Sequence, residues 1–515
     1  MNSFRVMDMR SSSIIGLLNL LLVLQVSRVV GVEVDPADAK IVYSGRWDLR
    51  EPHEPSCAWQ GSSFKVAFRG RWVCATIDCD RNEYVRIVVD GNSAGSRRSK
   101  LKKGSQTLYL AQDLPAGGHQ IEVVKETYSG PGYLTLRSIE VPGELLRCEP
   151  IIRLRVQYYG DSNLAGHSLG HEKNKGGAEF AGCHFTFAGI ASRMLDADYQ
   201  NISCGGAGIL GRSNSVMNFY DRIDFYQAQP KWEFTRFPAD ICVVNIGAND
   251  IKRRTKTELK QDFKQLLRVL RKVHPDAHFV LMNGYGWDRR EPANYTHEVV
   301  SEIGEGNMSC LTFPWLFNEW HGCEYDHAGM ARTLVEHLGK IKPSWKQVRS
   351  MDVMDGFGRN GDFANGGFEH VAPFGGFGWR YSEDGATRVY APGDSAKGQW
   401  YLHLPEGKQV HQPNPARKDR SYRVNMKLRS PHTTGKARIR VEFRDQQWRN
   451  EIANSAREFE FPLTDRWQEY SLGVNSPSGT KDPSRDPWQI IIRLFADKGD
   501  IHCDDVRLTG LEVSK

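Results

Sequence analysis

The stretch IRLRVQYYGDSNLAGHSLG, residues 152–170, runs from an alternating apolar segment directly into Gly-Asp-Ser. Apolar alternation with a period of two predicts a β-strand, and the glycine marks its end. An isolated Gly-Asp-Ser is more often a turn than a catalytic motif. In an open α/β sheet, however, ligands bind beyond the carboxyl ends of the strands, so Ser162 stands where a nucleophile would be placed.

The sequence that follows alternates strands with helices. ICVVNIG and FVLMNGYG predict buried parallel strands. Between them, LKQDFKQLLRVLRKV predicts a helix behind a capping box formed by Thr255 and Glu258. Its apolar face comprises Leu259, Phe263, Leu266, Leu267 and Leu270. This pattern predicts an α/β layer with crossover helices.

The flanking regions have a different periodicity. Short β-type runs such as FKVAFRG, YVRIVVDG and HQIEVVKE come before the α/β region, and SYRVNMKLRS, ARIRVEFRD and WQIIIRLF come after it. Period-two runs without helix-length apolar faces predict antiparallel sandwiches. A chain of 515 residues has room for three such units. We therefore expect domains at 32–149, 150–346 and 347–515.

The N-terminus is typical of a targeting signal. Arg5 and Arg10 precede the apolar run SIIGLLNLLLVLQV, and small residues follow near Gly31. We expect residues 1–31 to be a signal peptide and the mature protein to be secreted, without stable membrane insertion; an uncleaved signal anchor is the alternative. The net charge of +6 comes without a long Lys/Arg run, so nucleic acid is not an expected partner.

The ten cysteines all follow the expected signal, which fits an oxidising compartment. None forms Cys-x-x-Cys, so no zinc site is expected. Cys310 and Cys323 are spaced to form a disulfide around the loop between them, worth about 3 kcal/mol. Cys74 and Cys79 are expected on opposite faces of one strand and unpaired with each other. Three Asn-x-Ser/Thr sequons would carry glycans in a eukaryotic secreted protein: Asn201, Asn294 and Asn307.

Two further segments supply candidates for an oxyanion hole. NIGAND puts Asn249 beyond a strand end, where a neutral amide can donate to a developing oxyanion without competing for the serine proton. SCGGAG supplies Gly205 and Gly206, whose backbone N–H groups can approach a substrate closely. Taken singly, the asparagine could also start a turn and the glycines could be ordinary loop residues.

The base is sought in LFNEWHGCEYDHAGMARTLVEHLGKI, which contains two candidate histidines. His327 would lie in the first turn of a helix capped by Asp326, where the helix dipole disfavours an imidazolium, so we assign it a structural role. His321, in the preceding loop, is the candidate base. Glu319 could orient its imidazole or could be a surface carboxylate.

These segments together resemble a known superfamily. Gly160-Asp161-Ser162, SCGGAG, GAND and the late histidine resemble the four blocks of the SGNH or GDSL hydrolases. YSGRWDLREPHEPSCAWQGSSFKVAFRG, VVDG and LPAGGHQIEVVKET resemble the N-terminal sandwich of carbohydrate esterase family two, the acetyl xylan esterase type. The resemblance covers roughly residues 40–345. It implies a jelly-roll sandwich in front of a three-layer SGNH domain.

The resemblance also implies roles for particular residues. Ser162 would be the nucleophile and His321 the general base and then acid. The oxyanion hole would comprise the Ser162 N–H, the Gly206 N–H and the Asn249 side chain. No metal or organic cofactor is required.

The sequence departs from the superfamily pattern around the histidine. Asn318 stands where a DxxH block has aspartate, Glu319 stands where family members often have aspartate, and Gly322 replaces a proline. Members of the family are known to work as a Ser-His dyad with a backbone carbonyl orienting the histidine. Both a triad with Glu319 and a dyad therefore remain open.

The C-terminal segment NGDFANGGFEHVAPFGGFGWRY, with YRVNMKLRS and DRWQEYSLGV, resembles carbohydrate-binding modules of the galactose-binding-like sandwich class, in the group that includes families four and nine. Exposed aromatic rings would stack on sugars. The candidates are Trp379, Trp400, Trp448 and Trp488. The alternative places most of them in the core, and Trp467 is expected to pack inward.

The sequence therefore predicts a secreted serine esterase that removes O-acetyl groups from a polysaccharide such as acetylated xylan or glucomannan. The alternative is a non-catalytic carbohydrate-binding or matrix protein with a degenerate hydrolase fold. The joint presence of Ser162, Asn249 and His321 favours the enzyme.

Overall fold

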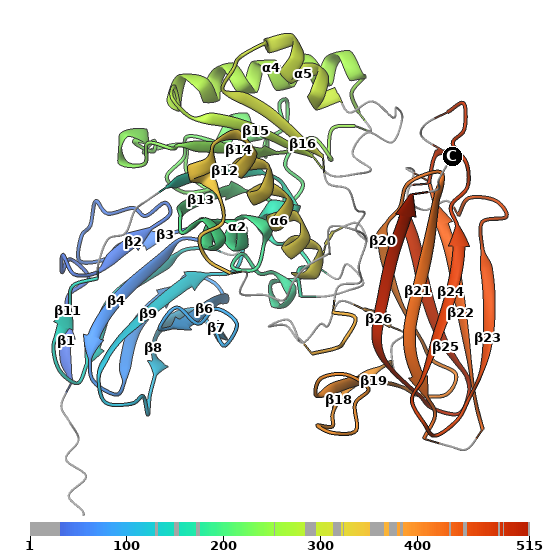
Figure 1. The fold of residues 1–515 in the computed structure, drawn as a ribbon. Helices are drawn as coiled ribbons and strands as arrows, with labels where there is room; N and C mark the ends of the chain where they lie inside the picture. Colours follow the sequence, from blue (N-terminus) through green and yellow to red (C-terminus); the bar gives the residue numbers. More distant parts are fainter. Residues whose placement is uncertain are drawn as a thin grey trace, which may run out of the picture.

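The computed structural model shows three groups of β-sheets along the chain (Figure 1). It describes residues 31–128, 132–148, 154–170, 176–251, 253–283, 295–312, 321–322, 324–350, 365–369, 379–381, 385–431, 434–445, 451–482, 485–487 and 489–512. Residues 1–30 of the expected signal peptide, Asn318 and Glu319 lie outside these ranges. Within them, no helix has the length and apolarity needed to cross a membrane.

The first group, which we call the N-terminal sandwich, consists of two antiparallel sheets. Their strand orders are β1-β10-β5-β8, with β3 beside β10, and β11-β4-β9-β6-β7, with β2 beside β4. The strands are β1 (Val32–Val34), β2 (Val42–Ser44), β3 (Ser56–Cys57), β4 (Ser63–Arg69), β5 (Val73–Cys79), β6 (Glu83–Val89), β7 (Arg97–Leu101), β8 (Gly104–Ala111), β9 (Gly118–Lys125), β10 (Leu134–Val141) and β11 (Leu145–Leu146). Alternating apolar residues of both sheets, such as Val66 and Ile121 of one and Ile77 and Leu136 of the other, form one buried core.

The second group, the α/β unit, contains one parallel sheet in the order β13-β12-β14-β15-β16. Its strands are β12 (Arg155–Gly160), β13 (Asp198–Ser203), β14 (Ile241–Asn245), β15 (His278–Asn283) and β16 (Met308–Thr312). Its helices are α1 (Ser162–Ala165), α2 (Phe187–Leu195), α3 (Val216–Phe219), α4 (Lys256–Val273), α5 (Tyr295–Ile303) and α6 (Glu324–Ile341). Helices α2 and α6 cover one face of the sheet, and α4 and α5 cover the other (Figure 1).

Coverage of both faces explains the continuous apolar strands of this unit. Tyr158 and Val243 pack toward α2 and α6, whereas their neighbours Tyr159 and Val244 pack toward α4. The predicted start of α4 is confirmed: the Thr255 hydroxyl accepts from the Glu258 N–H at 3.3 Å. All five predicted apolar residues of α4 are buried. The α/β layer and its crossover helices are thus as the sequence predicts.

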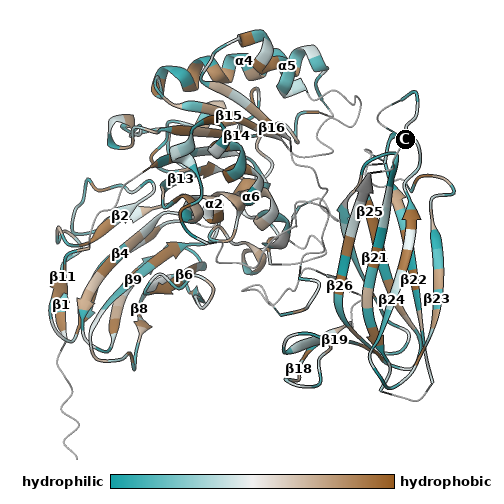
Figure 2. Cartoon of the chain, viewed as in Figure 1, coloured by the Kyte–Doolittle hydropathy of each residue, from teal (hydrophilic) through white to brown (hydrophobic). Residues whose placement is uncertain are grey.

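The third group, the C-terminal sandwich, has two antiparallel sheets in the orders β17-β20-β25-β22-β23 and β18-β19-β26-β21-β24. The strands are β17 (Arg380–Tyr381), β18 (Thr387–Tyr390), β19 (Trp400–Leu404), β20 (Gln409–Pro415), β21 (Arg420–Arg429), β22 (Gly435–Arg444), β23 (Arg457–Leu463), β24 (Gln468–Asn475), β25 (Gln489–Lys498) and β26 (Ile501–Glu512). Apolar and polar residues alternate along these strands (Figure 2). The inward-facing apolar residues form one core, as period-two patterning requires.

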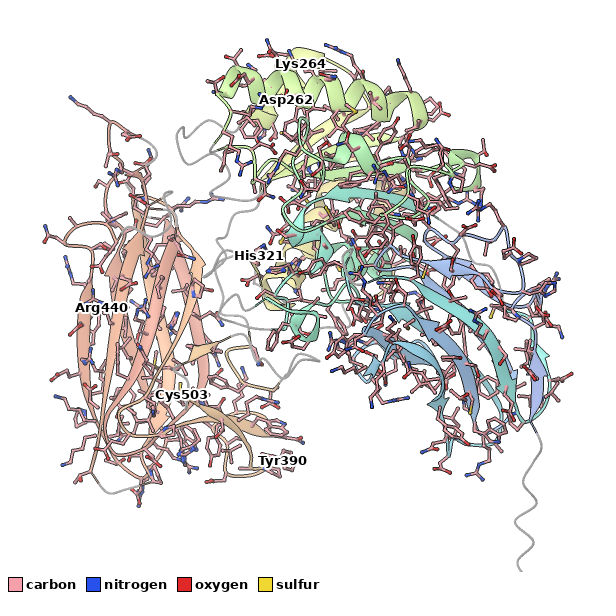
Figure 3. The ribbon with its side chains drawn as sticks, turned by 180° about the vertical axis from the view of Figure 1, so that it is seen from behind. Asp262, Lys264, His321, Tyr390, Arg440 and Cys503 are labelled. Atoms are coloured by element: carbon pink, nitrogen blue, oxygen red, sulfur yellow. The ribbon has the colours of Figure 1, made fainter. Side chains whose placement is uncertain are left out.

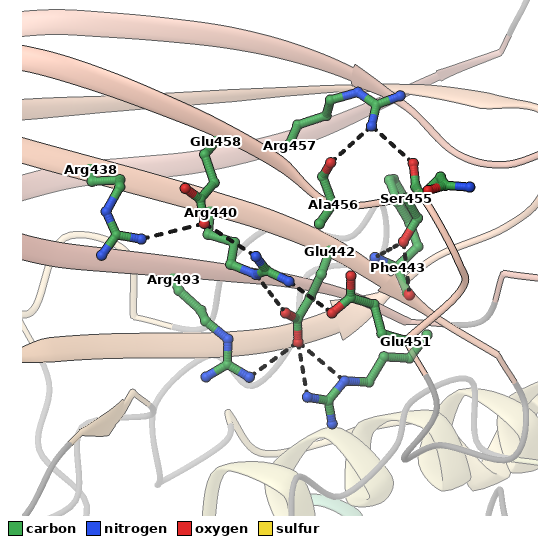
Figure 4. Close-up of polar contacts among 12 residues, drawn as sticks. Arg438, Arg440, Glu442, Phe443, Glu451, Ser455, Ala456, Arg457, Glu458 and Arg493 are labelled. Carbon is green, nitrogen blue, oxygen red and sulfur yellow. Dashed lines mark hydrogen bonds and ion pairs between the residues drawn. The ribbon is translucent and has the colours of Figure 1, made fainter.

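The outward-facing residues of β22 form a ladder of ion pairs (Figure 4). The Glu442 carboxylate accepts from Arg440 at 3.2 Å, from Arg444 at 2.9 Å and from Arg493 at 3.1 Å. Arg440 also reaches Glu451 and Glu458 on the neighbouring segments. This face of the sheet is therefore polar.

The tryptophans of the C-terminal sandwich correct two predictions. Trp379 is only 1% exposed and packs against Phe368, with ring centroids 5.6 Å apart, so it belongs to the core and has no face for a sugar. Trp400 is partly exposed. Trp467, expected to pack inward, is also only partly buried, and its indole N–H donates to the Asp394 carbonyl at 2.7 Å. Trp448 and Trp488 lie outside the described residues.

The cysteines and the glycosylation sequons correct two further predictions. Cys310 is a free thiol whose sulfur lies 2.7 Å from Nδ1 of His297, so the predicted pairing with Cys323, a residue outside the described part, is not formed here. Cys74 and Cys79 are not paired with each other, as predicted, and both are free thiols. Asn201 is only 2% exposed, because it lies on β13, paired with β12, and its amide donates to the Leu164 carbonyl at 2.8 Å; a glycan has no room there. Asn294 is not described, and Asn307 is exposed.

Buried polar contacts join the N-terminal sandwich to the α/β unit. The fully buried Arg46 donates to the Gln200 side chain and to the carbonyls of Tyr220 and Arg222. The Glu126 carboxylate accepts from the Arg86 guanidinium at 2.6 Å and from the backbone N–H of His184 at 2.9 Å. Because these polar groups satisfy one another across the boundary, separating the two units would leave them unpaired.

Candidate active site

Ser162 is the first residue of α1 and follows strand β12, which ends at Gly160, after the single residue Asp161. The Asp161 carboxylate caps this turn by accepting from the Asn163 N–H at 3.1 Å. Gly160 lies so close to the neighbouring strand that an added Cβ would be 2.6 Å from the Asn245 carbonyl oxygen, so only glycine fits there. The strand end therefore holds the serine at the carboxyl edge of the sheet, as predicted.

His321 lies beside this serine although 159 residues separate them in the chain. Nε2 of His321 is 2.7 Å from Oγ of Ser162, and the two residues are 9% and 8% exposed. Figure 3 shows His321 on the α/β unit. In the tautomer with its proton on Nδ1, the imidazole can accept the serine proton through Nε2. The geometry is that of a nucleophile and its base.

The surroundings of His321 keep its imidazole neutral. Burial, as the largest cause, and the neighbouring His167 and His327 together lower its pKa to about 3. A neutral imidazole is the form that can take a proton from serine. The same burial makes the imidazolium that forms on proton transfer costly, so the site favours the neutral resting form of His321 rather than a strong base.

The loops that carry the oxyanion-hole candidates flank Ser162. Strand β12 lies between β13 and β14, so the loops after these two strands emerge on either side of the serine. Gly206, in the first loop, has a φ of 69°, in the left-handed region that favours glycine. Asn249, in the second, donates from Nδ2 to the Ala207 carbonyl at 2.9 Å and so ties the two loops together. Its amide nitrogen carries a second hydrogen that could serve an oxyanion.

The other histidine of the predicted segment has a structural position. His327 is fully buried, and its Nδ1 accepts from the Phe187 backbone N–H at 3.1 Å. Its ring stacks on the Phe187 ring with centroids 5.9 Å apart. Asp326, expected to be the helix cap, lies inside α6, because that helix begins two residues earlier, at Glu324. Glu319 cannot be placed because it lies outside the described residues.

Two residues of the site were not predicted. His167 packs edge to face against His321, with ring centroids 4.5 Å apart. The Tyr128 hydroxyl lies 2.9 Å from Nδ1 of His167. His167 is visible in the motif itself, five residues after the serine. Tyr128 carries no sequence signal, because it comes from the N-terminal sandwich and reaches the site only through the packing of the two units.

Two regions of the chain match known families. Residues 43–149 match the family described as carbohydrate esterase 2 N-terminal, and residues 158–307 match the GDSL-like lipase/acylhydrolase family. The matched part of the chain thus has the domain combination of one class of proteins: a carbohydrate esterase 2 N-terminal domain followed by a GDSL-like lipase/acylhydrolase domain. The resemblance that the sequence predicts for the first two units is confirmed.

Curated relatives agree with this class. The chain is 25% identical over 335 residues to the cellulase/esterase CelE of Acetivibrio thermocellus, a match that covers 60% of this chain and 40% of that protein. It is 23% identical over 326 residues to an acetylxylan esterase / glucomannan deacetylase of Cellvibrio japonicus, covering 59% of this chain and 90% of that protein.

Solved structures share the fold of the first two units. A family two carbohydrate esterase from Clostridium thermocellum, in complex with cellohexaose, superposes with a TM-score of 0.54 at 23% identity and covers 59% of this chain and 99% of that one. A family two carbohydrate esterase from Cellvibrio japonicus has a TM-score of 0.55 at 19% identity and covers 61% and 99%. At these identities the likeness shows the fold alone.

Proposed function

We propose that this protein is a secreted serine esterase that removes O-acetyl groups from a polysaccharide such as acetylated xylan or glucomannan. The observation that carries the proposal is the buried contact of 2.7 Å between Ser162 Oγ and His321 Nε2 at the carboxyl edge of the parallel sheet. The names of the two curated relatives support an acetylated plant-type glycan as the substrate.

The proposed reaction is acyl transfer in two steps. His321 takes the Ser162 proton while Oγ attacks the acetyl carbonyl, and the sugar hydroxyl leaves with the proton that His321 returns. Water then attacks the acetyl-serine by the same route and releases acetate. The N–H groups of Ser162 and Gly206 and the Asn249 side chain would stabilise the oxyanion in each step. No metal or organic cofactor takes part, and Glu319 could orient His321 if it completes a triad.

The three sheet groups are proposed to be domains at 32–149, 150–346 and 347–515, after a signal peptide at 1–31, with the first a jelly roll. We propose that the C-terminal sandwich is of the galactose-binding-like class and binds carbohydrate. Trp400 supports this role: it is partly exposed and its ring lies 5.0 Å from that of Tyr390, which is 56% exposed. The Arg388 guanidinium lies over the Trp400 ring, 4.1 Å from its centroid, so the more exposed Tyr390 ring would supply most of the surface for a sugar.

The test is acetate release from acetylated xylan and acetylated glucomannan by the parent protein and by Ser162→Ala. We expect release from at least one polymer by the parent and loss in the variant. A folded parent protein that hydrolyses neither polymer nor a small aryl acetate would contradict the proposal and would favour the non-catalytic carbohydrate-binding protein.

A further inference from the structure

The Tyr128 side chain connects the N-terminal sandwich to both sides of the candidate site. On one side its hydroxyl lies 2.9 Å from Nδ1 of His167, whose ring packs against that of His321. On the other side its ring lies against Gly205, where an added Cβ would be 3.4 Å from Cε2 of the tyrosine. Gly205 immediately precedes the oxyanion-hole candidate Gly206. One side chain therefore touches the loop of the oxyanion hole and the neighbour of the base.

The backbone that carries Tyr128 is held rigidly. Lys125, at the end of β9, is fully buried, and its ammonium group donates to Glu83 at 3.1 Å and to the Thr127 carbonyl at 3.0 Å. The Thr127 hydroxyl donates to the same Glu83 carboxylate. The Glu126 carbonyl accepts from the Cys183 N–H of the α/β unit at 3.2 Å. These contacts hold residues 125–127 to the sandwich and to the α/β unit. The position of the adjacent Tyr128 is therefore well defined.

His167 lies between Tyr128 and His321 and can restrict the position of the His321 ring. Its backbone N–H donates to the Ser162 carbonyl at 2.9 Å, so the turn after α1 places it next to the nucleophile. Burial lowers the pKa of His167, which favours the neutral imidazole. A neutral ring held at one nitrogen by a phenol can pack against a second imidazole without repulsion between two positive charges, and it limits rotation of the His321 ring away from Ser162.

We propose that Tyr128 and His167 are positioning residues for His321, so that the N-terminal sandwich helps to build the catalytic centre. The proposal rests on the function proposed above, in which Ser162 and His321 react. Neither residue needs to touch the substrate for this role. Its effect is on the fraction of molecules in which Nε2 is aimed at Oγ, which appears in kcat rather than in KM.

The experiment uses Tyr128→Phe in the full-length protein with a small aryl acetate as substrate. Phenylalanine keeps the packing against Gly205 and removes only the hydroxyl. We expect kcat to fall about threefold to tenfold, the effect of one lost hydrogen bond, with KM changed less than about twofold. Tyr133→Phe is the matched control, because Tyr133 belongs to the same sandwich and its hydroxyl contacts Gln227 instead. It should leave kcat unchanged.

A double-mutant cycle with His167→Phe separates positioning from general loosening. In the His167→Phe background the hydroxyl has no imidazole to hold, so Tyr128→Phe should cause no further fall in kcat. Equal losses in both backgrounds would overturn the proposal, and so would a Tyr128→Phe variant with the kcat of the parent. A loss on acetylated xylan with none on the aryl acetate would show a sugar contact instead and would also overturn it. If Ser162→Ala remains active, the proposed function fails first.

Discussion

The neutrality of His321 comes from its immediate neighbours. Burial is the largest cause of the lowered pKa of His321. The imidazoles of His167 and His327 are the other two causes. All three causes disfavour the protonated form. An isolated histidine near pKa 6.5 would be largely protonated in mildly acidic solution, whereas His321 is arranged to stay unprotonated there.

This arrangement predicts the pH dependence of activity. Activity needs neutral His321, so it is lost as pH falls through the pKa of that residue, which is lowered to about 3. We expect kcat/KM for an aryl acetate at pH 5 to stay close to its value at pH 7. With an unshifted pKa of about 6.5, only about 3% of the His321 side chains would be neutral at pH 5, and kcat/KM would fall accordingly. A rate profile from pH 4 to 8, with circular dichroism to confirm folding, decides between them; an acidic limb near pH 6.5 would show that His321 is not in this environment during catalysis.

Asn249 gives a second prediction at the residue scale. If its amide donates to the oxyanion, Asn249→Ala should lower kcat by about 10²–10³ with a small change in KM. Asn249→Asp should be at least as impaired, because a carboxylate cannot donate and repels the oxyanion. Asn218→Ala, an exposed asparagine on α3, is the control and should retain full activity. Equal activity of Asn249→Ala and the control would remove Asn249 from the oxyanion hole.

At the scale of the elements, the site depends on where β12 ends and α1 begins. Asp161 caps α1 from a fully buried position. Its pKa is raised from 3.8 to about 7, mainly by burial and also by the negative charge of Asp250. The strand end that presents the nucleophile therefore holds a carboxyl group that is costly to ionise.

The cost of ionising Asp161 predicts a change in stability with pH. The Asp161 carboxyl stays protonated to a higher pH in the folded protein than in the unfolded chain. Its contribution to the free energy of unfolding is therefore fully present below pH 3.8 and is lost as the pH rises through about 7. Asp161→Asn cannot ionise, and its amide oxygen can still accept from the Asn163 N–H. The melting temperature of the variant minus that of the parent should thus be several degrees larger at pH 8 than at pH 5. Calorimetry at both pH values measures this; an equal difference at the two values would contradict it.

At the scale of the whole molecule, local patterns predicted the elements, and packing decided the rest. The strand β12 and helix α4 follow from residues that are neighbours in sequence, so both were predictable. The Asn201 sequon and Trp379 match motifs that say nothing about burial, and both lie inside the protein. Tyr128 and its partner His167 are 39 residues apart in the chain, and they meet only because the two units pack against each other. No local pattern encodes such a contact.

That packing predicts how the first two units unfold. Arg86 and Glu126 form an ion pair in which neither side chain is more than 1% exposed, and Glu126 also accepts from the α/β unit at His184. Arg86→Met would leave the Glu126 charge buried without its guanidinium partner, which costs about 3–5 kcal/mol in comparable pairs. Because Glu126 spans the boundary, the loss should lower the stability of both units in a single transition rather than release the sandwich alone.

The comparison is with Arg440→Met, in the outward-facing ion-pair ladder of the C-terminal sandwich (Figure 4). The Arg440 side chain is 30% exposed, and Glu442 keeps Arg444 and Arg493, so the cost should be roughly 1 kcal/mol or less. Urea unfolding followed by tryptophan fluorescence and by esterase activity measures both variants. For Arg86→Met the two signals should shift together to lower urea. If activity survives while the fluorescence transition splits, the N-terminal sandwich unfolds independently, and its contribution to the catalytic centre through Tyr128 would then be dispensable.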